Sequence, residues 1–213
     1  MSDQKLIIGI AGKKQSGKSS AEVQMLRAFR EIDPSLTIGT RALAERIKDI
    51  AVTALSLPPE LVYGDEEAKK QKTAYEWRDT PYADENTHEL MTVREVLQVL
   101  GTECFRTWFG KDIWINLTLQ RIQQSAAQVT IISDVRFKNE VEKILEQPRG
   151  YVLHLTRDPL KGTDYHQSEI DLNNFDWKRP RCINLDNSEM DLAVQEDAVR
   201  RITKRICEQE KIR

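Results

Sequence analysis

A short stretch near the amino terminus constrains what this chain can fold into more than any other segment. Residues 12–20 have the sequence GKKQSGKSS, and this spacing of glycines, lysine and serine is typical of a phosphate-binding loop, whose backbone N–H groups surround an anion. The apolar run at 6–11 predicts a buried strand before the loop, and apolar residues at helical spacing over 21–29 predict a helix after it. The loop would therefore hold phosphate at a helix N-terminus, where free N–H groups favour negative charge.

These residues predict a nucleoside triphosphate site that uses Mg²⁺. We expect the Lys18 ammonium to reach the β and γ phosphates and the Ser19 hydroxyl to bind Mg²⁺. The alternative is a turn that merely carries lysines, which the flanking strand and helix disfavour. The residues predicted to bind ATP are Gly12, Gln15, Ser16, Gly17, Lys18, Ser19 and Ser20.

Composition limits both the domain count and the class of partner. The 213 residues, 39% of them hydrophobic, suffice for one substantial core with a small inserted subdomain, so we expect one domain over 1–213. The net charge of -2 lacks the basic excess of proteins whose main partner is nucleic acid. Apolar runs are too short for a signal peptide or a membrane span, and the cysteines lie far apart. We expect a cytoplasmic protein with reduced thiols and no membrane contact; a homodimer is compatible with the sequence.

Predicted strands alternate with predicted helices along the chain. Strands are expected over 6–11, 129–134, 151–157 and 182–185, with one further short strand that ends near Gly39. Helices are expected over 41–55, 113–127, 135–145 and 188–212, with one further helix that begins at Thr92. Residues 57–91 are expected to be mainly loop. This order predicts an α/β fold, a P-loop NTPase three-layer sandwich with a central parallel sheet of about five strands. A helical acceptor-binding insertion at 57–127 and a lid segment at 157–172 complete the prediction.

Ligands of such sheets collect at the carboxyl ends of the strands. The phosphate loop and residues 39–41, 134–136 and 156–157 all fall at such ends, so we expect them to meet in one cleft. Asp134 is predicted to bind Mg²⁺ there, directly or through water. The alternative role for Asp134 is the N-cap of the following helix.

Arginines are the second candidate group of phosphate ligands. A guanidinium is always charged and binds phosphate through two N–H groups, so several of them suit a reaction with two phosphorylated partners. The alternative for each is a surface salt bridge. On the helix that begins at Thr92, residues four apart share a face, which predicts a stripe of polar residues next to Glu103. This stripe either contacts an acceptor or faces solvent. The arginines are Arg41, Arg94, Arg106, Arg136 and Arg157, and the stripe is Arg94, Gln98, Thr102 and Arg106.

Apolar and aromatic positions give further expectations. Thr92 and Glu95 have the spacing of a capping box. Trp108, Phe109 and Trp114 are expected to lie mainly in the core, with Trp114 preferred as a ring that stacks on a base. His166, in the predicted lid, is expected to be a structural hydrogen-bonding residue. In the last helix, the residues expected to face the core are Leu192, Val199, Ile202 and Ile206.

Several separated segments resemble the deoxynucleoside monophosphate kinase family, which is known best from bacteriophages and is part of the P-loop nucleoside monophosphate kinase group. They are GKKQSGKSS, MTVREVLQVLGTECFR with the following DIWIN, ISDVRFKNEVE, and HQSE with the later INLDNS. The second and third are the specific ones. The resemblance implies Mg²⁺-dependent transfer of the ATP γ-phosphoryl group to a deoxynucleoside 5′-monophosphate, giving the diphosphate and ADP, in the host cytoplasm if the chain is phage-encoded.

The resemblance also implies roles for particular residues. Lys18, Asp134, Arg136 and Arg157 would be catalytic. The chain departs from the family after the predicted strand near Gly39, where TRALAERIKDI stands in place of a segment resembling FADPLK, which leaves the acceptor contacts of this edge open. The residues assigned to acceptor binding are Lys13, Arg41, Arg94, Gln98, Thr102, Glu103, Arg106 and Trp114.

Two other functions remain open at this stage. A phosphate acceptor is already an anionic nucleophile, so positioning and charge neutralisation suffice for catalysis. A P-loop kinase with a hydroxyl acceptor, a nucleoside or a modified base in phage DNA, would instead need Asp134 or Glu103 as a general base. A nucleotide-binding switch without an acceptor is the third hypothesis.

Overall fold

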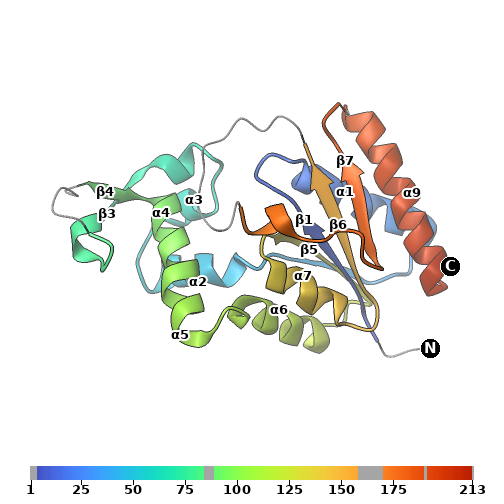
Figure 1. Cartoon of the computed structure of the whole chain (residues 1–213), viewed down its shortest axis with the longest axis horizontal. Helices are drawn as coiled ribbons and strands as arrows, with labels where there is room; N and C mark the ends of the chain where they lie inside the picture. The colour runs from blue at the N-terminus through green and yellow to red at the C-terminus, as the bar shows by residue number, and fades with distance from the viewer. Residues whose placement is uncertain (1–3, 84–88, 158–169, 190, 213) are drawn as a thin grey trace. The chain divides into compact units, whose positions relative to one another are not determined.

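A computed structural model describes residues 4–83, 89–157, 170–189 and 191–212 (Figure 1). The chain divides into two compact units, Met1–Leu43 with Ile115–Arg213, and Ala44–Trp114. We call the first the sheet unit and the second the inserted unit. Among the described residues no helix combines the length and the apolar character that crossing a membrane requires.

The sheet unit is built on five parallel strands in the order β2-β5-β1-β6-β7. Except for β6 and β7, neighbouring strands are not consecutive in the chain. Parallel neighbours need crossover connections, so the chain must pass over the faces of the sheet between them. The predicted α/β sandwich with a central parallel sheet is confirmed. The strands are β1 (Leu6–Ala11), β2 (Ile38–Arg41), β5 (Val129–Val135), β6 (Gly150–Thr156) and β7 (Cys182–Asp186).

Helices cover both faces of this sheet. Alternate residues of a strand point to opposite faces, so β1 sends Ile8 and Ile10 into one core and Ile7 into another. The helices of the first core are α1 (Lys18–Ile32) and α9 (Leu192–Glu210), and those of the second are α6 (Ile113–Gln124) and α7 (Lys138–Leu145). A short turn of helix, η4 (Asp171–Asn174), lies before β7.

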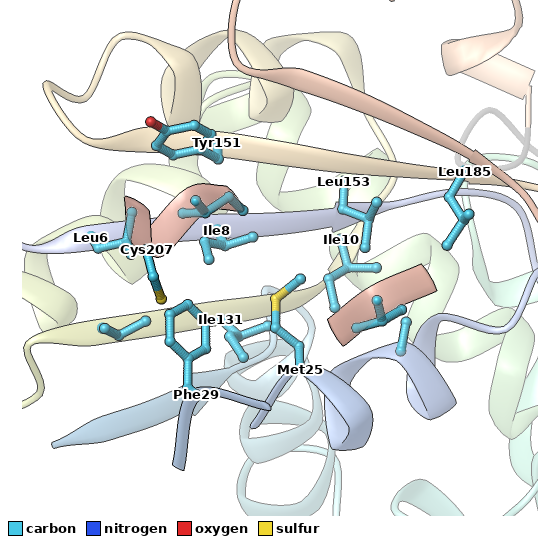
Figure 2. Packing of buried hydrophobic residues seen from close by; sticks show 14 of the residues in the cluster. Leu6, Ile8, Ile10, Met25, Phe29, Ile131, Tyr151, Leu153, Leu185 and Cys207 are labelled. Atoms are coloured by element: carbon cyan, nitrogen blue, oxygen red, sulfur yellow. The ribbon is translucent and has the colours of Figure 1, made fainter. Parts of the chain in front are cut away.

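The first core fixes α1, and with it the phosphate loop, against the strands. Figure 2 shows Met25 and Phe29 of α1 reaching toward the strands that carry Ile8, Ile10 and Ile131. Both side chains are 0% exposed, and burying each contributes roughly 1.5–3 kcal/mol. The start of α1 is therefore held firmly at the end of β1.

Two predictions at helix ends are wrong. Arg41 is still in β2, and α2 (Glu45–Thr53) begins later than expected. Leu192 is 68% exposed rather than inward. Leu192 is the first residue of α9, directly after the N-cap Asp191. Helical side chains point toward the N-terminus of their helix and pack over the preceding turn. No helical turn precedes Leu192, so its side chain stays exposed.

The inserted unit contains more regular structure than predicted. Strands β3 (Lys72–Glu76) and β4 (Leu90–Thr92) pair antiparallel within the segment expected to be loop. Met91 is the only buried residue of these two strands, so the alternation of buried apolar residues that would have predicted them is missing. The remaining elements are α2, α3 (Pro59–Val62), η1 (Ala68–Lys70), η2 (Trp77–Asp79), α4 (Val93–Gln98), η3 (Val99–Arg106) and α5 (Thr107–Phe109).

The inserted unit has its own small core, formed chiefly by Ala51, Leu57, Val62, Met91, Val93 and Val96. The predicted capping box is present at the start of α4, where the Thr92 side chain accepts from the Glu95 backbone N–H. Ile115 and Ile122 of α6 instead pack in the core of the sheet unit.

Candidate active site

The phosphate loop joins β1 to α1 in a conformation that needs glycine at two points. Gly12 has a φ of 151° and Gly17 a φ of 96°. A Cβ atom on Gly12 would lie 2.5 Å from the Leu155 carbonyl oxygen and 2.7 Å from the Ser16 Oγ. Gln15 also adopts a positive φ, 62°. Ser19 is exposed and Ser20 half-buried in the first turn of α1.

Lys18 carries a positive charge into a partly buried place. Its Nζ donates to the carbonyl oxygens of Gly12 at 2.6 Å and Lys13 at 2.5 Å. Burial, and then the positive charge of Arg136, lower the pKa of Lys18 to about 7, while the Asp134 charge opposes this. An anion bound beside Lys18 would favour its charged form. Binding of phosphate would therefore offset part of the free energy that burying this charge costs.

Two carboxylates lie near Lys18. Asp134, at the end of β5, accepts from the Leu43 backbone N–H at 2.7 Å. The helix α7 is capped differently, because Glu140 accepts from the backbone N–H groups of Arg136 and Phe137. The alternative role of Asp134 as the N-cap of that helix is therefore wrong.

Glu22 is the second carboxylate, and sequence analysis missed it. It accepts from the hydroxyls of Ser133 and Thr40, and burial followed by the Asp134 charge raises its pKa, against the effect of these hydrogen bonds. Its position four residues after Lys18 on α1 was the available signal, since such residues share a helix face. The ends of β2 and β5 and the start of α1 thus bring two acids and a lysine together.

A cavity of about 420 Å³ adjoins the phosphate loop. Lys13, Arg136 and Arg157 line it together with Gly12 and Ser16. Arg157 Nη1 also contacts the Gln15 carbonyl oxygen at 3.5 Å. Three of the predicted cationic ligands therefore line one cavity, whereas Lys18 and Arg41 are not among the described residues that line it.

An aromatic pair that sequence analysis did not single out lines the same cavity. The rings of His154 and Trp177 stack 3.7 Å apart, nearly parallel. His154 Nδ1 lies 3.0 Å from Asn184 Oδ1, and burial lowers the pKa of the imidazole despite that contact. Much of the predicted lid, residues 158–169 with His166, lies outside the described residues.

In the inserted unit, Trp114 is not placed to stack on a base. Its side chain is 2% exposed, its indole N–H donates to the Gly101 carbonyl at 2.8 Å, and its ring packs 4.9 Å from that of Phe105. The base-stacking prediction is corrected, because both faces of a buried ring are covered by protein. Trp108 and Phe109, expected in the core, are 82% and 68% exposed.

The predicted polar stripe changes because Val99–Arg106 is a π-helix. In a π-helix each N–H bonds to the carbonyl five residues back, so residues four apart no longer align as in an α-helix. Gln98, Thr102 and Arg106 therefore do not form the single stripe expected from their spacing. Gly101 lies in this segment, where a Cβ atom would meet the Ile47 Cδ1 at 2.8 Å.

The remaining predicted acceptor residues are distributed over both units. Arg94, in α4, pairs with Glu66, and Arg106 Nη1 donates to the Lys111 carbonyl at 3.0 Å. Glu103 is half-buried within the π-helix. In the sheet unit, Arg41 ends β2, and its buried Nε has no hydrogen-bond partner among the described residues.

Comparison with protein families gives the decisive observation. A family model described as deoxynucleotide monophosphate kinase matches residues 50–178, more than half of the chain. The chain belongs to the deoxynucleotide monophosphate kinase family. Membership implies a nucleotide kinase and confirms the family resemblance drawn from the sequence. A comparison with curated proteins found no match. The phosphate loop, residues 12–20, precedes the matched region.

Proposed function

We propose that this protein transfers the γ-phosphoryl group of ATP to a deoxynucleoside 5′-monophosphate, giving the deoxynucleoside diphosphate and ADP. The observation that carries the proposal is the place of Lys18 at the phosphate loop, where its partly buried ammonium donates to the Gly12 and Lys13 carbonyl oxygens and where burial and Arg136 lower its pKa. Such a charge is costly in the free protein and is compensated by a phosphate anion. Family membership supports a nucleotide as the substrate.

On the donor side, the loop and its cations bind the polyphosphate. Backbone N–H groups at the start of α1 hold phosphate oxygens, and Lys18 bridges the β and γ phosphates. Arg136 and Arg157, which line the adjoining cavity, neutralise the charge that builds up on the transferred group. Ser16, Gly17, Ser19 and Ser20 belong to the same loop and first turn.

Mg²⁺ fits the oxygen ligands at this site. A hydroxyl and a carboxylate are the donors that Mg²⁺ prefers, with water and substrate phosphate completing its shell. Ser19 and Asp134 would supply them, and Mg²⁺ held there would neutralise charge on the substrate phosphates. Asp134 also favours the charged form of Lys18, so it assists phosphate binding through the lysine as well.

On the acceptor side, we assign Lys13 and Arg41 in the sheet unit and five residues of the inserted unit. The buried Nε of Arg41 supports a role in binding an anion, and the family match spans most of the inserted unit. The acceptor phosphate attacks as an anion, so catalysis depends on alignment and charge rather than on a general base. The five are Arg94, Gln98, Thr102, Glu103 and Arg106.

The test is ADP formation from ATP and Mg²⁺ with a panel of deoxy- and ribonucleoside monophosphates, nucleosides and single-stranded DNA. We expect turnover with deoxynucleoside monophosphates and a loss of at least about a hundredfold in Lys18→Ala. Turnover with nucleosides or DNA would instead support a hydroxyl acceptor. Slow hydrolysis that no acceptor stimulates would support a nucleotide-binding switch.

A further inference from the structure

Two buried amide side chains contact the phosphate loop from a distant part of the chain. Asn187, directly after β7, donates through Nδ2 to the Ser16 carbonyl oxygen at 3.0 Å. Gln195, in the first turns of α9, donates through Nε2 to the Gly17 carbonyl oxygen at 3.2 Å. Asn187 is 4% exposed and Gln195 2% exposed. Consecutive carbonyls of the loop are therefore held by one side chain from the β7–α9 connection and one from the first turn of α9.

The contact is close enough to explain why the loop has glycine at this point. A Cβ atom on Gly17 would lie 2.5 Å from Asn187 Nδ2 and 2.7 Å from Gln195 Nε2. Asn187 is itself anchored, because its backbone N–H donates to the Thr156 carbonyl at 2.8 Å. The two amides thus occupy the space beside Gly17 that a side chain would need.

Because the peptide bond is planar, a contact that fixes a carbonyl oxygen also fixes the direction of the next residue's N–H group. In a trans peptide the C=O of one residue and the N–H of the next point in opposite directions. Holding the Ser16 and Gly17 carbonyls against the amides therefore turns the N–H groups of Gly17 and Lys18 the other way. These N–H groups belong to the set with which such a loop surrounds phosphate.

The Ser16 side chain is a second sign that the loop is arranged for a ligand. Its Oγ is buried and has no hydrogen-bond partner among the described residues, although Ser16 lines the cavity beside the loop. A buried hydroxyl without a partner is costly. A phosphate oxygen in that cavity would accept its hydrogen bond.

We infer that Asn187 and Gln195 are positioning residues for polyphosphate binding. They fix two loop carbonyls and thereby direct the N–H groups of Gly17 and Lys18 toward the phosphates. The inference rests on the proposed nucleotide site at this loop. It adds that the β7–α9 connection and the start of α9, which lie beyond the region matched by the family model, contribute to donor binding.

The chain offers a matched control for Gln195. Gln24 is also buried, at 8% exposed, and also donates to a backbone carbonyl at 3.2 Å, that of Leu192. It lies in the same contact between α1 and α9, but its acceptor is outside the phosphate loop. Gln195→Met and Gln24→Met therefore remove equivalent hydrogen bonds while keeping a side chain of similar shape.

The experiment measures the Kd of each protein for ATP and for inorganic tripolyphosphate by calorimetry, with melting temperatures in parallel. We expect a smaller loss of melting temperature in Gln24→Met, because the buried Oε1 of Gln24 has no hydrogen-bond partner among the described residues. Binding of both ligands should weaken about tenfold in Gln195→Met only, since the Gly17 carbonyl then loses its side-chain donor and keeps only the Ala21 backbone N–H. Asn187→Leu, which removes the neighbouring donor, should weaken both ligands likewise if Gln195→Met does not fold.

Three outcomes are distinguishable. Weaker tripolyphosphate binding in Gln195→Met or Asn187→Leu, with Gln24→Met close to wild type, supports the inference. Equal affinities in all the proteins would overturn it while leaving the proposed nucleotide site intact. A wild-type chain that binds neither ATP nor tripolyphosphate would contradict the proposed function, and the inference with it.

Discussion

Replacing Lys18 with methionine should stabilise the unliganded protein at neutral pH, by the cost of the charge less the cost of losing the two hydrogen bonds that Lys18 donates. This gain should shrink as the pH rises. The folded structure lowers the pKa of Lys18 from 10.5 to about 7, first through burial and then through Arg136. Each pKa unit corresponds to about 1.4 kcal/mol, so keeping this lysine in the fold costs up to about 5 kcal/mol near neutral pH. Methionine keeps the aliphatic length without a charge.

The direction of this pH dependence follows from the number of protons that Lys18 binds in the folded and in the unfolded state. Between pH 7 and pH 10.5 the unfolded lysine holds its proton while the folded one has released it. Unfolding therefore takes up a proton in this window, and the wild-type free energy of unfolding rises with pH. Below pH 7 both states hold the proton, so the difference between the two proteins is constant there.

Urea unfolding of both proteins at pH 6, 7, 8 and 9 measures this effect. The variant cancels the contributions of other titrating groups, because only Lys18 differs. We expect the stability advantage of Lys18→Met to fall by about 2 to 3 kcal/mol between pH 7 and pH 9. An advantage that stays constant over this range would refute the argument that Lys18 is held in the fold against the cost of its own charge.

Three further substitutions have defined outcomes. Gly17→Ala should lower the free energy of unfolding by about 1 to 3 kcal/mol in urea, because its Cβ atom would approach two amide nitrogens at a φ of 96°; unchanged stability would show that the loop accommodates a side chain. Trp114→Phe should cost about 1 to 3 kcal/mol in the same assay by leaving the Gly101 carbonyl without its indole donor, and a neutral effect would mean that another group replaces that donor. Asp134→Asn keeps an oxygen that can accept from the Leu43 N–H, so the melting temperature of this variant should stay near that of the wild type. Its kcat should fall about a hundredfold or more. A normal kcat would show that Asp134 is not a catalytic residue.

The features that the sequence predicted well are those whose cause is local. The strand over Leu6–Ala11, the phosphate loop and the following helix depend on neighbouring residues, and all three lie where expected. The parallel order of the sheet follows from the alternation of strands and helices. The functional family could also be inferred, since two specific segments lie inside the matched region.

The features that were missed depend on residues distant in the chain or on exposed backbone. Asn187 and Gln195 contact the loop across a large sequence separation, and although Asn187 lies in the segment INLDNS that carries the family resemblance, its spacing does not indicate this contact. The pairing of β3 with β4 uses backbone hydrogen bonds and few buried side chains.

Aromatic residues and the π-helix illustrate a further difficulty. Trp108 and Trp114 are equally apolar, yet one is 82% and the other 2% exposed. The apolar spacing after Thr92 suits an α-helix, whereas Val99–Arg106 adopts a π-helix. A change of helix type alters which side chains share a face, so the residues of a stripe cannot be chosen from α-helical spacing alone.

The most direct test of the proposed kinase activity follows the phosphoryl group itself. ATP labelled in its γ-phosphate would be incubated with Mg²⁺, the protein and each deoxynucleoside monophosphate in turn, and the labelled product identified by chromatography. We predict that the label appears in a deoxynucleoside diphosphate in equal amount to the ADP formed, and that Lys18→Ala slows the transfer by at least about a hundredfold. Label found only in inorganic phosphate, whichever acceptor is present, would contradict the proposed function.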